Sequence, residues 1–213
     1  MKKCTLHGHA NLFSQQTLQL MELLRRHDLH AYAHSMKTTS YYIDFCLSHS
    51  FHSLLKPIML QSVLLHDIGK LLVSKEILQK DGPLTLSEMN DLKRHPEFGI
   101  ELLGDYHDIE FEPHIILNHH ENSDGTGYPY HLNNEQLSQS VKVIRVIDSF
   151  SAMISVRPYS PKCSVKEAIQ EIHYQKDRFY DPTIASLFIH YLEERFKAKT
   201  ILLHYLDYVS HKK

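Results

Sequence analysis

An all-α fold, arranged as a single helical bundle, is the fold class that this sequence predicts. Apolar residues recur at helical spacing along most of the 213 residues, as at Leu18, Met21 and Leu24 near the start. Signals for helix starts separate these stripes, and the short apolar runs fit a helical period better than a strand period. Hydrophobic residues make up 42% of the chain and charged residues 23%, which provides for a buried core and excludes a disordered chain.

The bundle is expected to span residues 30–213, after a lead-in helix over residues 1–29. Within the bundle, His34, Tyr41 and Phe45 share the next helical stripe. The aromatic members of this stripe predict a helix that packs into the core. His34 lies on the same face.

Prolines and a capping box mark the next helices along the chain. Pro57 suits the first turn of a helix whose apolar stretch runs to Leu65, and Gly69 suits a helix end soon after it. A capping box at Thr85 opens a helix that is expected to continue through Leu103.

The second half of the chain shows the same pattern. Pro113 begins a helix that reaches two consecutive histidines, and a polar loop rich in turn residues extends over 121–134. A long helix is expected over about residues 135–156. A second capping box at Ser164 and then Pro182 begin the last two helices.

Charge and cysteine content limit the functional classes. Lys and Arg number 23 and Asp and Glu number 25, and this balance excludes a general DNA-binding protein, which needs a basic excess. No apolar run approaches the roughly 20 residues that cross a bilayer, so no membrane association is expected. Cys4, Cys46 and Cys163 are odd in number and far apart, and the start of the chain resembles no secretory signal. The expected location is the reducing cytoplasm.

Histidine is unusually abundant, with 18 copies against 7 glycines. Several histidines and aspartates fall on helix faces that should be apolar, where an unpaired imidazole or carboxylate is unfavourable. Each could instead be an ordinary core histidine with its own hydrogen-bond partner, or a solvated aspartate. Seven such positions on five helices favour a metal centre inside the bundle, where bound metal ions would offset the cost of burying all of these groups. The seven are His34, His66, Asp67, His95, His119, His120 and Asp148.

The sequence around these positions resembles a known family. His66-Asp67 is the paired motif of the HD phosphohydrolases, and residues 64–70 (LLHDIGK) are similar to the HD-GYP subgroup, which is associated with hydrolysis of cyclic di-GMP. Residues 119–129 (HHENSDGTGYP) are the strongest further match, and the ordered motifs extend from about His34 to Phe188. The resemblance implies a single HD-domain helical bundle with a buried bimetal centre.

The same resemblance implies a ligand set. Asp67 would bridge two divalent metal ions, of which Fe and Mn fit the N/O donors best and Zn, Co or Ni are other occupants. A hydroxide that bridges the ions would attack phosphorus in line and open cyclic di-GMP to linear pGpG, with GMP as a further product. His34, His66 and Asp148 would complete the protein shell of one ion, and His95, His119 and His120 that of the other.

Four more residues take roles by this resemblance. Lys70 would act beside Asp67 as a catalytic residue that contacts the substrate phosphate, and Arg157 and Lys162 would bind the substrate. His30 stands where some relatives carry a glutamate that binds a third metal ion. It is either a ligand of such an ion or a neighbour outside the direct ligands, and we expect the second.

The motif over 119–129 ends in a loop rich in glycine. Gly125 and Gly127 permit positive φ and Pro129 stiffens the next segment, so a loop of fixed shape is expected. This loop either frames the cleft or forms a surface for a protein partner. Its residues are Asp124, Gly125, Gly127, Tyr128 and Pro129.

This chain departs from the family pattern at several places. Asn122-Ser123 stands where an Arg-aromatic pair is common, and Ser151 replaces the second aspartate after Asp148. Because these changes remove charge around the ligands, two alternatives to the cyclic di-GMP phosphodiesterase stay open. One is a weak or inactive module that binds a cyclic dinucleotide or a protein partner, and the other is an HD hydrolase of another nucleotide.

Overall fold

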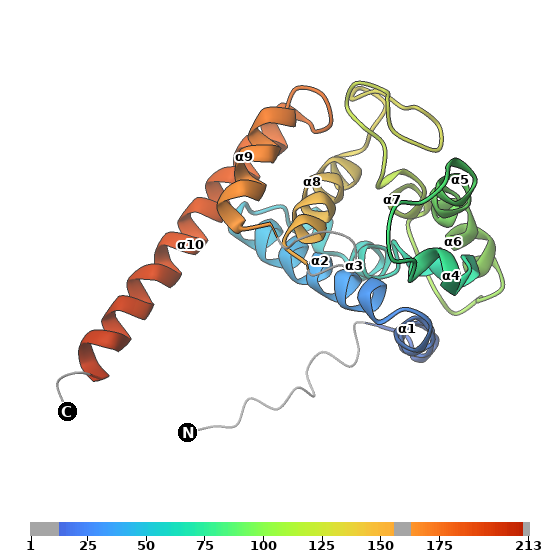
Figure 1. The fold of residues 1–213 in the computed structure, drawn as a ribbon, viewed down its shortest axis with the longest axis horizontal. Helices are drawn as coiled ribbons and strands as arrows, with labels where there is room; N and C mark the ends of the chain where they lie inside the picture. The colour runs from blue at the N-terminus through green and yellow to red at the C-terminus, as the bar shows by residue number, and fades with distance from the viewer. Residues whose placement is uncertain (1–12, 156–162, 211–213) are drawn as a thin grey trace.

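The computed structural model describes residues 13–155 and 163–210, with side chains up to residue 197. Its secondary structure is helical, which confirms the all-α prediction (Figure 1). Within the described ranges, extended pairing is confined to an isolated bridge between Asp124 and Asn133. The elements in chain order are α1 (Gln15–His27), α2 (Leu29–Ser48), η2 (His52–Leu55), α3 (Pro57–Leu64), η3 (Ile68–Leu72), α4 (Lys75–Leu78), α5 (Leu86–Lys93), α6 (His95–Gly104), α7 (Pro113–Asn118), α8 (Gln139–Met153), α9 (Val165–Gln175) and α10 (Pro182–Ser210).

The buried face of α1 differs from the expected stripe. Leu18 is 46% exposed, whereas Thr17, Leu20, Met21 and Leu24 are buried. Both α2 and η3 pack against the face that carries Leu20, so they decide which residues of the amphipathic helix face inward. The expected boundary at residue 30 between a lead-in helix and the bundle stays a prediction.

The packing of η3 against α6 depends on a glycine. Gly69 lies inside η3, so the expectation that it ends the preceding helix is wrong. A Cβ at this position would overlap the carbonyl oxygen of His95 and the backbone nitrogen of Gly99. Gly69 therefore lets η3 and α6 pack backbone against backbone, which brings Asp67 next to His95.

A helix break also places His95. The capping box predicted at Thr85 is present and begins α5, but α5 ends at Lys93 and a new helix, α6, begins at His95. The single helix expected through Leu103 is therefore wrong. Pro96 is the physical reason, because proline disrupts a helix interior yet suits a first turn.

The next two helices are shorter than expected. α7 ends just before His119, which is its C-cap. α8 begins at Gln139 instead of about residue 135 because the Ser138 side chain caps it, accepting a hydrogen bond from the main-chain N–H of Val141. It ends at Met153. The capping box at Ser164 and the start of α10 at residue 182 are as predicted.

Two hydrophobic clusters make up the core. The first contains Phe45, Phe150 and Phe188 and is built mainly from α2, α8, α9 and α10. The last turns of α10 extend beyond the bundle (Figure 1). The second contains Leu20 and Leu103 and lies among α1, η3 and α6. Helices α2, α3 and α7 contribute to both clusters and join them. Among the described helices, none has the length and hydrophobicity needed to cross a membrane.

Candidate metal centre

The seven side chains predicted from the sequence converge in the structure. Six of them are buried, and the side chain of the seventh, His120, is 22% exposed. They are His34 on α2, His66 and Asp67 in the turn between α3 and η3, His95 at the start of α6, His119 and His120 directly after α7, and Asp148 on α8.

The two carboxylate oxygens of Asp67 face different imidazoles. Oδ1 lies 3.2 Å from Nε2 of His95 and 3.9 Å from Nε2 of His119. Oδ2 lies 3.6 Å from Nε2 of His66 and 3.8 Å from Nε2 of His34. The donor atoms thus form two groups that share Asp67, and within each group they lie within 4.8 Å of one another. One group is Asp67, His95, His119 and His120, and the other is His34, His66 and Asp67. Asp148 belongs to neither group, although its Oδ1 lies 2.6 Å from Nε2 of His34.

Three of the histidines are anchored in the same way. In His66, His95 and His119, the ring Nδ1 lies 2.7–2.8 Å from the main-chain carbonyl oxygen three residues earlier. Each follows the end of a short helix (α3, α5 or α7), where the last carbonyl groups lack partners within the helix. Because a carbonyl only accepts, Nδ1 carries the proton and Nε2 presents a lone pair to the cluster.

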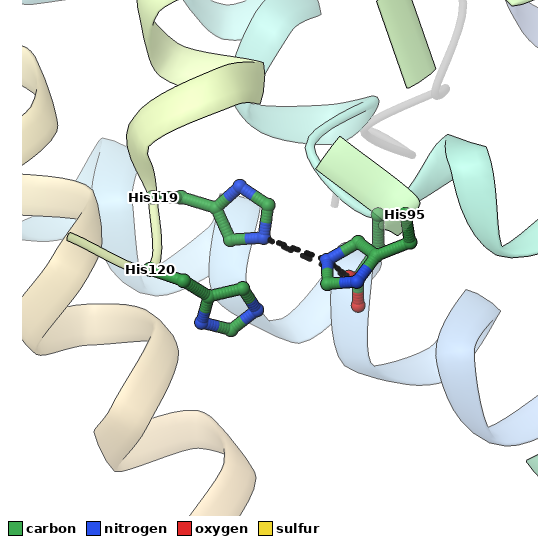
Figure 2. A group of neighbouring side chains, drawn as sticks. His95, His119 and His120 are labelled. Atoms are coloured by element: carbon green, nitrogen blue, oxygen red, sulfur yellow. Dashed lines mark hydrogen bonds and ion pairs between the residues drawn. The ribbon is translucent and has the colours of Figure 1, made fainter. Parts of the chain in front are cut away.

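This arrangement is unfavourable without a cation. Nε2 of His95 and Nε2 of His119 are 3.1 Å apart, and Figure 2 shows the two rings meeting at these atoms. With both Nδ1 atoms protonated, the two lone pairs repel each other. Nε2 of His66 is buried without a hydrogen-bond partner among the described residues, 3.4 Å from Oδ1 of Asp148. Unpartnered nitrogen donors beside carboxylates fit a metal ion.

Residues of α8 orient His34 from two sides. Its Nε2 lies 2.6 Å from Oδ1 of Asp148, and its Nδ1 lies 3.0 Å from Oγ of Ser151. The Ser151 hydroxyl is in turn 2.5 Å from Oγ1 of Thr38. The sequence marks Ser151 only as a departure from the family, whereas the structure places it against a predicted ligand.

Burial sets the protonation of most imidazoles in the cluster. It lowers the pKa of His34 and holds the pKa values of His119 and His120 well below the ordinary value, so these rings are neutral. Burial also opposes protonation of His66, but the charge of Asp67 and the contact with Asp148 outweigh it and raise the pKa of His66. Asp67 and Asp148 thus favour a positive charge next to Nε2 of His66.

The two carboxylates are ionised. Burial would raise the pKa of Asp67, but Lys70 and the neighbouring imidazoles hold it well below its usual value. Burial would likewise raise the pKa of Asp148, but His34, together with His66 and His120, holds it well below its usual value. Neutral imidazoles and charged carboxylates are the forms that bind metal ions.

A cavity of about 250 Å³ opens onto the cluster. Lys70 reaches it from η3, and its Nζ donates to Oδ2 of Asp67 at 2.6 Å. Tyr128 forms part of the wall and stacks on His120, with ring centroids 4.8 Å apart. The lining residues are His34, Asp67, Lys70, Leu92, His95, His120, Tyr128, Arg145, Asp148, Ser149 and Ala152.

The loop that carries Tyr128 has a defined shape. Asp124 accepts hydrogen bonds from the main-chain N–H and the hydroxyl of Thr126, and Gly125 adopts a φ of +77°. A Cβ on Gly127 would overlap the main chain of residues 121–122. The loop is therefore packed tightly against the segment that follows His120.

Glu121 and Arg145 are site residues that the sequence interpretation missed. The buried carboxylate of Glu121 accepts the main-chain N–H groups of Tyr130 at 2.7 Å and Leu132 at 3.1 Å, which holds the loop. Its position directly after the two histidines was the signal that could have marked it. Arg145 precedes Asp148 by three residues on α8, so helical spacing could have found it.

Of three other predicted residues, two lie outside the part of the chain that the structure describes, and one lies away from the cluster. Arg157 and Lys162 fall in residues 156–162, outside the described residues. His30 is exposed at the start of α2, where its main-chain N–H donates to Oδ1 of Asp28 at 2.8 Å. It belongs to neither group of donor atoms found in the described part of the chain.

A family model and a solved structure match most of the chain. The model, described as "HD domain", matches residues 19–184, which include all seven residues of the cluster. The solved structure is the HD domain of the phosphodiesterase PgpH from L. monocytogenes. The two folds superpose with a TM-score of 0.58 over 83% of this chain and 98% of that chain. At 17% identity, this likeness concerns the fold.

The similarity to curated relatives covers only part of the length of each relative. The chain is 39% identical over 120 residues to the cyclic di-GMP phosphodiesterase response regulator RpfG of Xanthomonas campestris, covering 55% of this chain and 32% of that protein. It is 30% identical over 127 residues to the 3'3'-cGAMP-specific phosphodiesterase 2 of Vibrio cholerae, covering 59% of this chain and 24% of that protein. The chain thus spans about a third or less of the length of these relatives.

Proposed function

Because this chain belongs to the HD domain family, we propose that it is a metal-dependent phosphodiesterase that hydrolyses a cyclic dinucleotide, with cyclic di-GMP as the first candidate. The observation that carries the proposal is the crowding of Nε2 atoms around Asp67. Nε2 of His66 is buried without a hydrogen-bond partner among the described residues, and Nε2 of His95 lies 3.1 Å from Nε2 of His119. Relatives named for the hydrolysis of cyclic di-GMP and of 3'3'-cGAMP support the substrate class.

The donor set suits two divalent transition-metal ions per chain. Asp67 would contribute to both because its two oxygens face different imidazoles. Nitrogen and carboxylate donors in this number favour Fe or Mn. When bound, the ions would polarise phosphoryl oxygens and lower the pKa of water. One ion would be held by His34, His66, Asp67 and Asp148, and the other by Asp67, His95, His119 and His120.

Residues around the donor set would position the substrate. The Lys70 ammonium lies at the cavity wall and can neutralise a phosphate oxygen. The anchored Nδ1 atoms keep the rings from turning, so no side-chain reorganisation is needed during the reaction. Tyr128 bounds the cavity and excludes water from one side. The exposed edge of its loop remains the proposed surface for a protein partner.

A comparative assay tests the proposed function. Protein loaded with Fe²⁺ or Mn²⁺ under reducing conditions should open cyclic di-GMP to a linear dinucleotide, and protein stripped with a chelator should not. Assays with 3'3'-cGAMP and with mononucleotides define the base and substrate preference. Tight binding without turnover would identify a binding module instead. Turnover of mononucleotides alone would identify an HD hydrolase of another type.

Lys70→Ala is expected to lower kcat/KM about 10-fold or more while the metal content stays unchanged. A charge-assisted hydrogen bond to phosphate contributes roughly 1.5–3 kcal/mol, and loss of a positive charge beside Asp67 does not weaken cation binding. Initial rates and elemental analysis measure the two effects. Lys80→Ala is the matched control, because Lys80 pairs with Glu88 and does not line the cavity. Loss of metal from Lys70→Ala would contradict the assigned role.

A further inference from the structure

Arg145 is a charged residue of the cavity wall to which neither the motifs nor the metal centre gives a role. It lies on α8 three residues before Asp148, so both side chains project from the same face of the helix. Its side chain lines the cavity together with Lys70 and Tyr128. Arg145 is only partly buried, and its guanidinium borders the space next to the donor cluster.

Neutral groups hold the guanidinium of Arg145 in place. Its Nε and Nη2 donate to Oδ1 of Asn122 at 3.1 and 2.7 Å, and its Nη1 donates to the hydroxyl of Ser149. The group also lies over the ring of Tyr180, 5.3 Å from the centroid. The Asn122 amide is itself oriented, because its Nδ2 donates to Oγ1 of Thr126 at 3.0 Å.

These contacts leave the positive charge of Arg145 and two of its N–H donors available for a ligand. Arg145 makes no ion pair among the residues that the structure describes, whereas Lys70 donates to Asp67 at 2.6 Å. Three of the five N–H groups of the guanidinium are used in the contacts with Asn122 and Ser149, so two remain. A fixed guanidinium with full charge beside a cavity is suited to an anion.

We propose that Arg145 is a substrate-binding residue that contacts an anionic phosphate oxygen of the cyclic dinucleotide. The inference rests on the proposed function. Its planar fork matches a phosphate, and a side chain that is already fixed loses little conformational entropy on binding. Asn122, two residues after His120, holds this guanidinium of α8 at the cavity.

The alternative role for Arg145 is to anchor the loop through Asn122. Three substitutions separate the roles. Arg145→Gln removes the charge but keeps an amide that can donate to Asn122, and Arg145→Lys keeps the charge but loses the fork. Asn122→Ala removes the acceptor and keeps the guanidinium, so it is the matched control for the anchor.

The experiment measures Kd and KM for cyclic di-GMP, kcat and metal content in the metal-loaded protein. Arg145→Gln should raise Kd and KM about 10–100-fold, since a hydrogen bond to a charged group is lost. Arg145→Lys should raise them less, and Asn122→Ala least. kcat should change less than KM because the contact is present before and during the reaction, and metal content should stay constant.

Two results would overturn the Arg145 proposal while leaving the proposed function intact. One is an unchanged Kd in Arg145→Gln, and the other is an equal loss of binding in Arg145→Gln and Asn122→Ala, which would show that the anchor alone matters. A wild-type protein that binds cyclic di-GMP without hydrolysing it would contradict the proposed function, and the comparison of Kd values would still test Arg145. A wild-type protein that does not bind cyclic di-GMP would contradict both.

Discussion

Asp67→Ala is expected to lose most of both metal ions and to lower kcat/KM by more than about 100-fold. Changing residues that merely support metal ligands typically lowers affinity or activity 10–100-fold, and a ligand shared by two ions should have a larger effect. The structure gives the reason, because Oδ1 of Asp67 faces His95 and Oδ2 faces His66. Removing one carboxylate therefore removes an oxygen from each donor group.

Elemental analysis of purified protein and initial rates with cyclic di-GMP measure this effect. Asp67→Asn keeps the shape of the side chain but not its charge, and should lose less metal than Asp67→Ala. Asp91→Ala is the matched control, since Asp91 is exposed on α5 and belongs to neither donor group. A wild-type level of metal in Asp67→Ala would contradict the shared role of this carboxylate.

Gly69→Ala is expected to lower the free energy of unfolding by about 3 kcal/mol, near the upper end of the effects of overpacking. The added Cβ would overlap main-chain atoms of His95 and Gly99, which cannot move aside as a flexible side chain could. For a chain of this size the change corresponds to a Tm lower by about 6–12 °C. Because the overlap falls on His95 itself, the metal content should fall as well.

Thermal unfolding followed by circular dichroism, together with elemental analysis, tests the prediction for Gly69. The matched control is Gly104→Ala at the end of α6, where an added Cβ has no neighbour within 4 Å. Alanine is the better helix former, so Gly104→Ala should leave Tm unchanged or raise it slightly. Equal melting temperatures of Gly69→Ala and the wild type would show that η3 and α6 can separate at little cost.

The helix starts marked by capping boxes were predicted correctly. The capping boxes at Thr85 and Ser164 each involve a glutamate three residues later, so all of the information lies within one turn. The extent of a helix was harder to predict. Apolar periodicity continued across the break at Arg94, although Pro96 marks it, and the cap at Ser138 was overlooked.

By itself, the sequence identified which polar residues lie on the buried faces of helices. A histidine or aspartate within an apolar stripe is visible from spacing alone, and seven such residues favoured a common partner inside an all-α bundle. The sequence also contained the motifs that identify the HD domain family. Both inferences need only the positions of residues along helices, which the chain specifies locally.

Only the tertiary structure decided which atoms meet. His34 and Asp148 are 114 residues apart in the chain, yet their side chains lie 2.6 Å apart, and Arg145 is held by Asn122 from another segment. The same packing decides that Leu20 faces inward instead of Leu18, and that position 69 has no room for a side chain. Spacing fixes the face of a helix on which a residue lies. The distances between faces arise when helices far apart in the chain pack against one another.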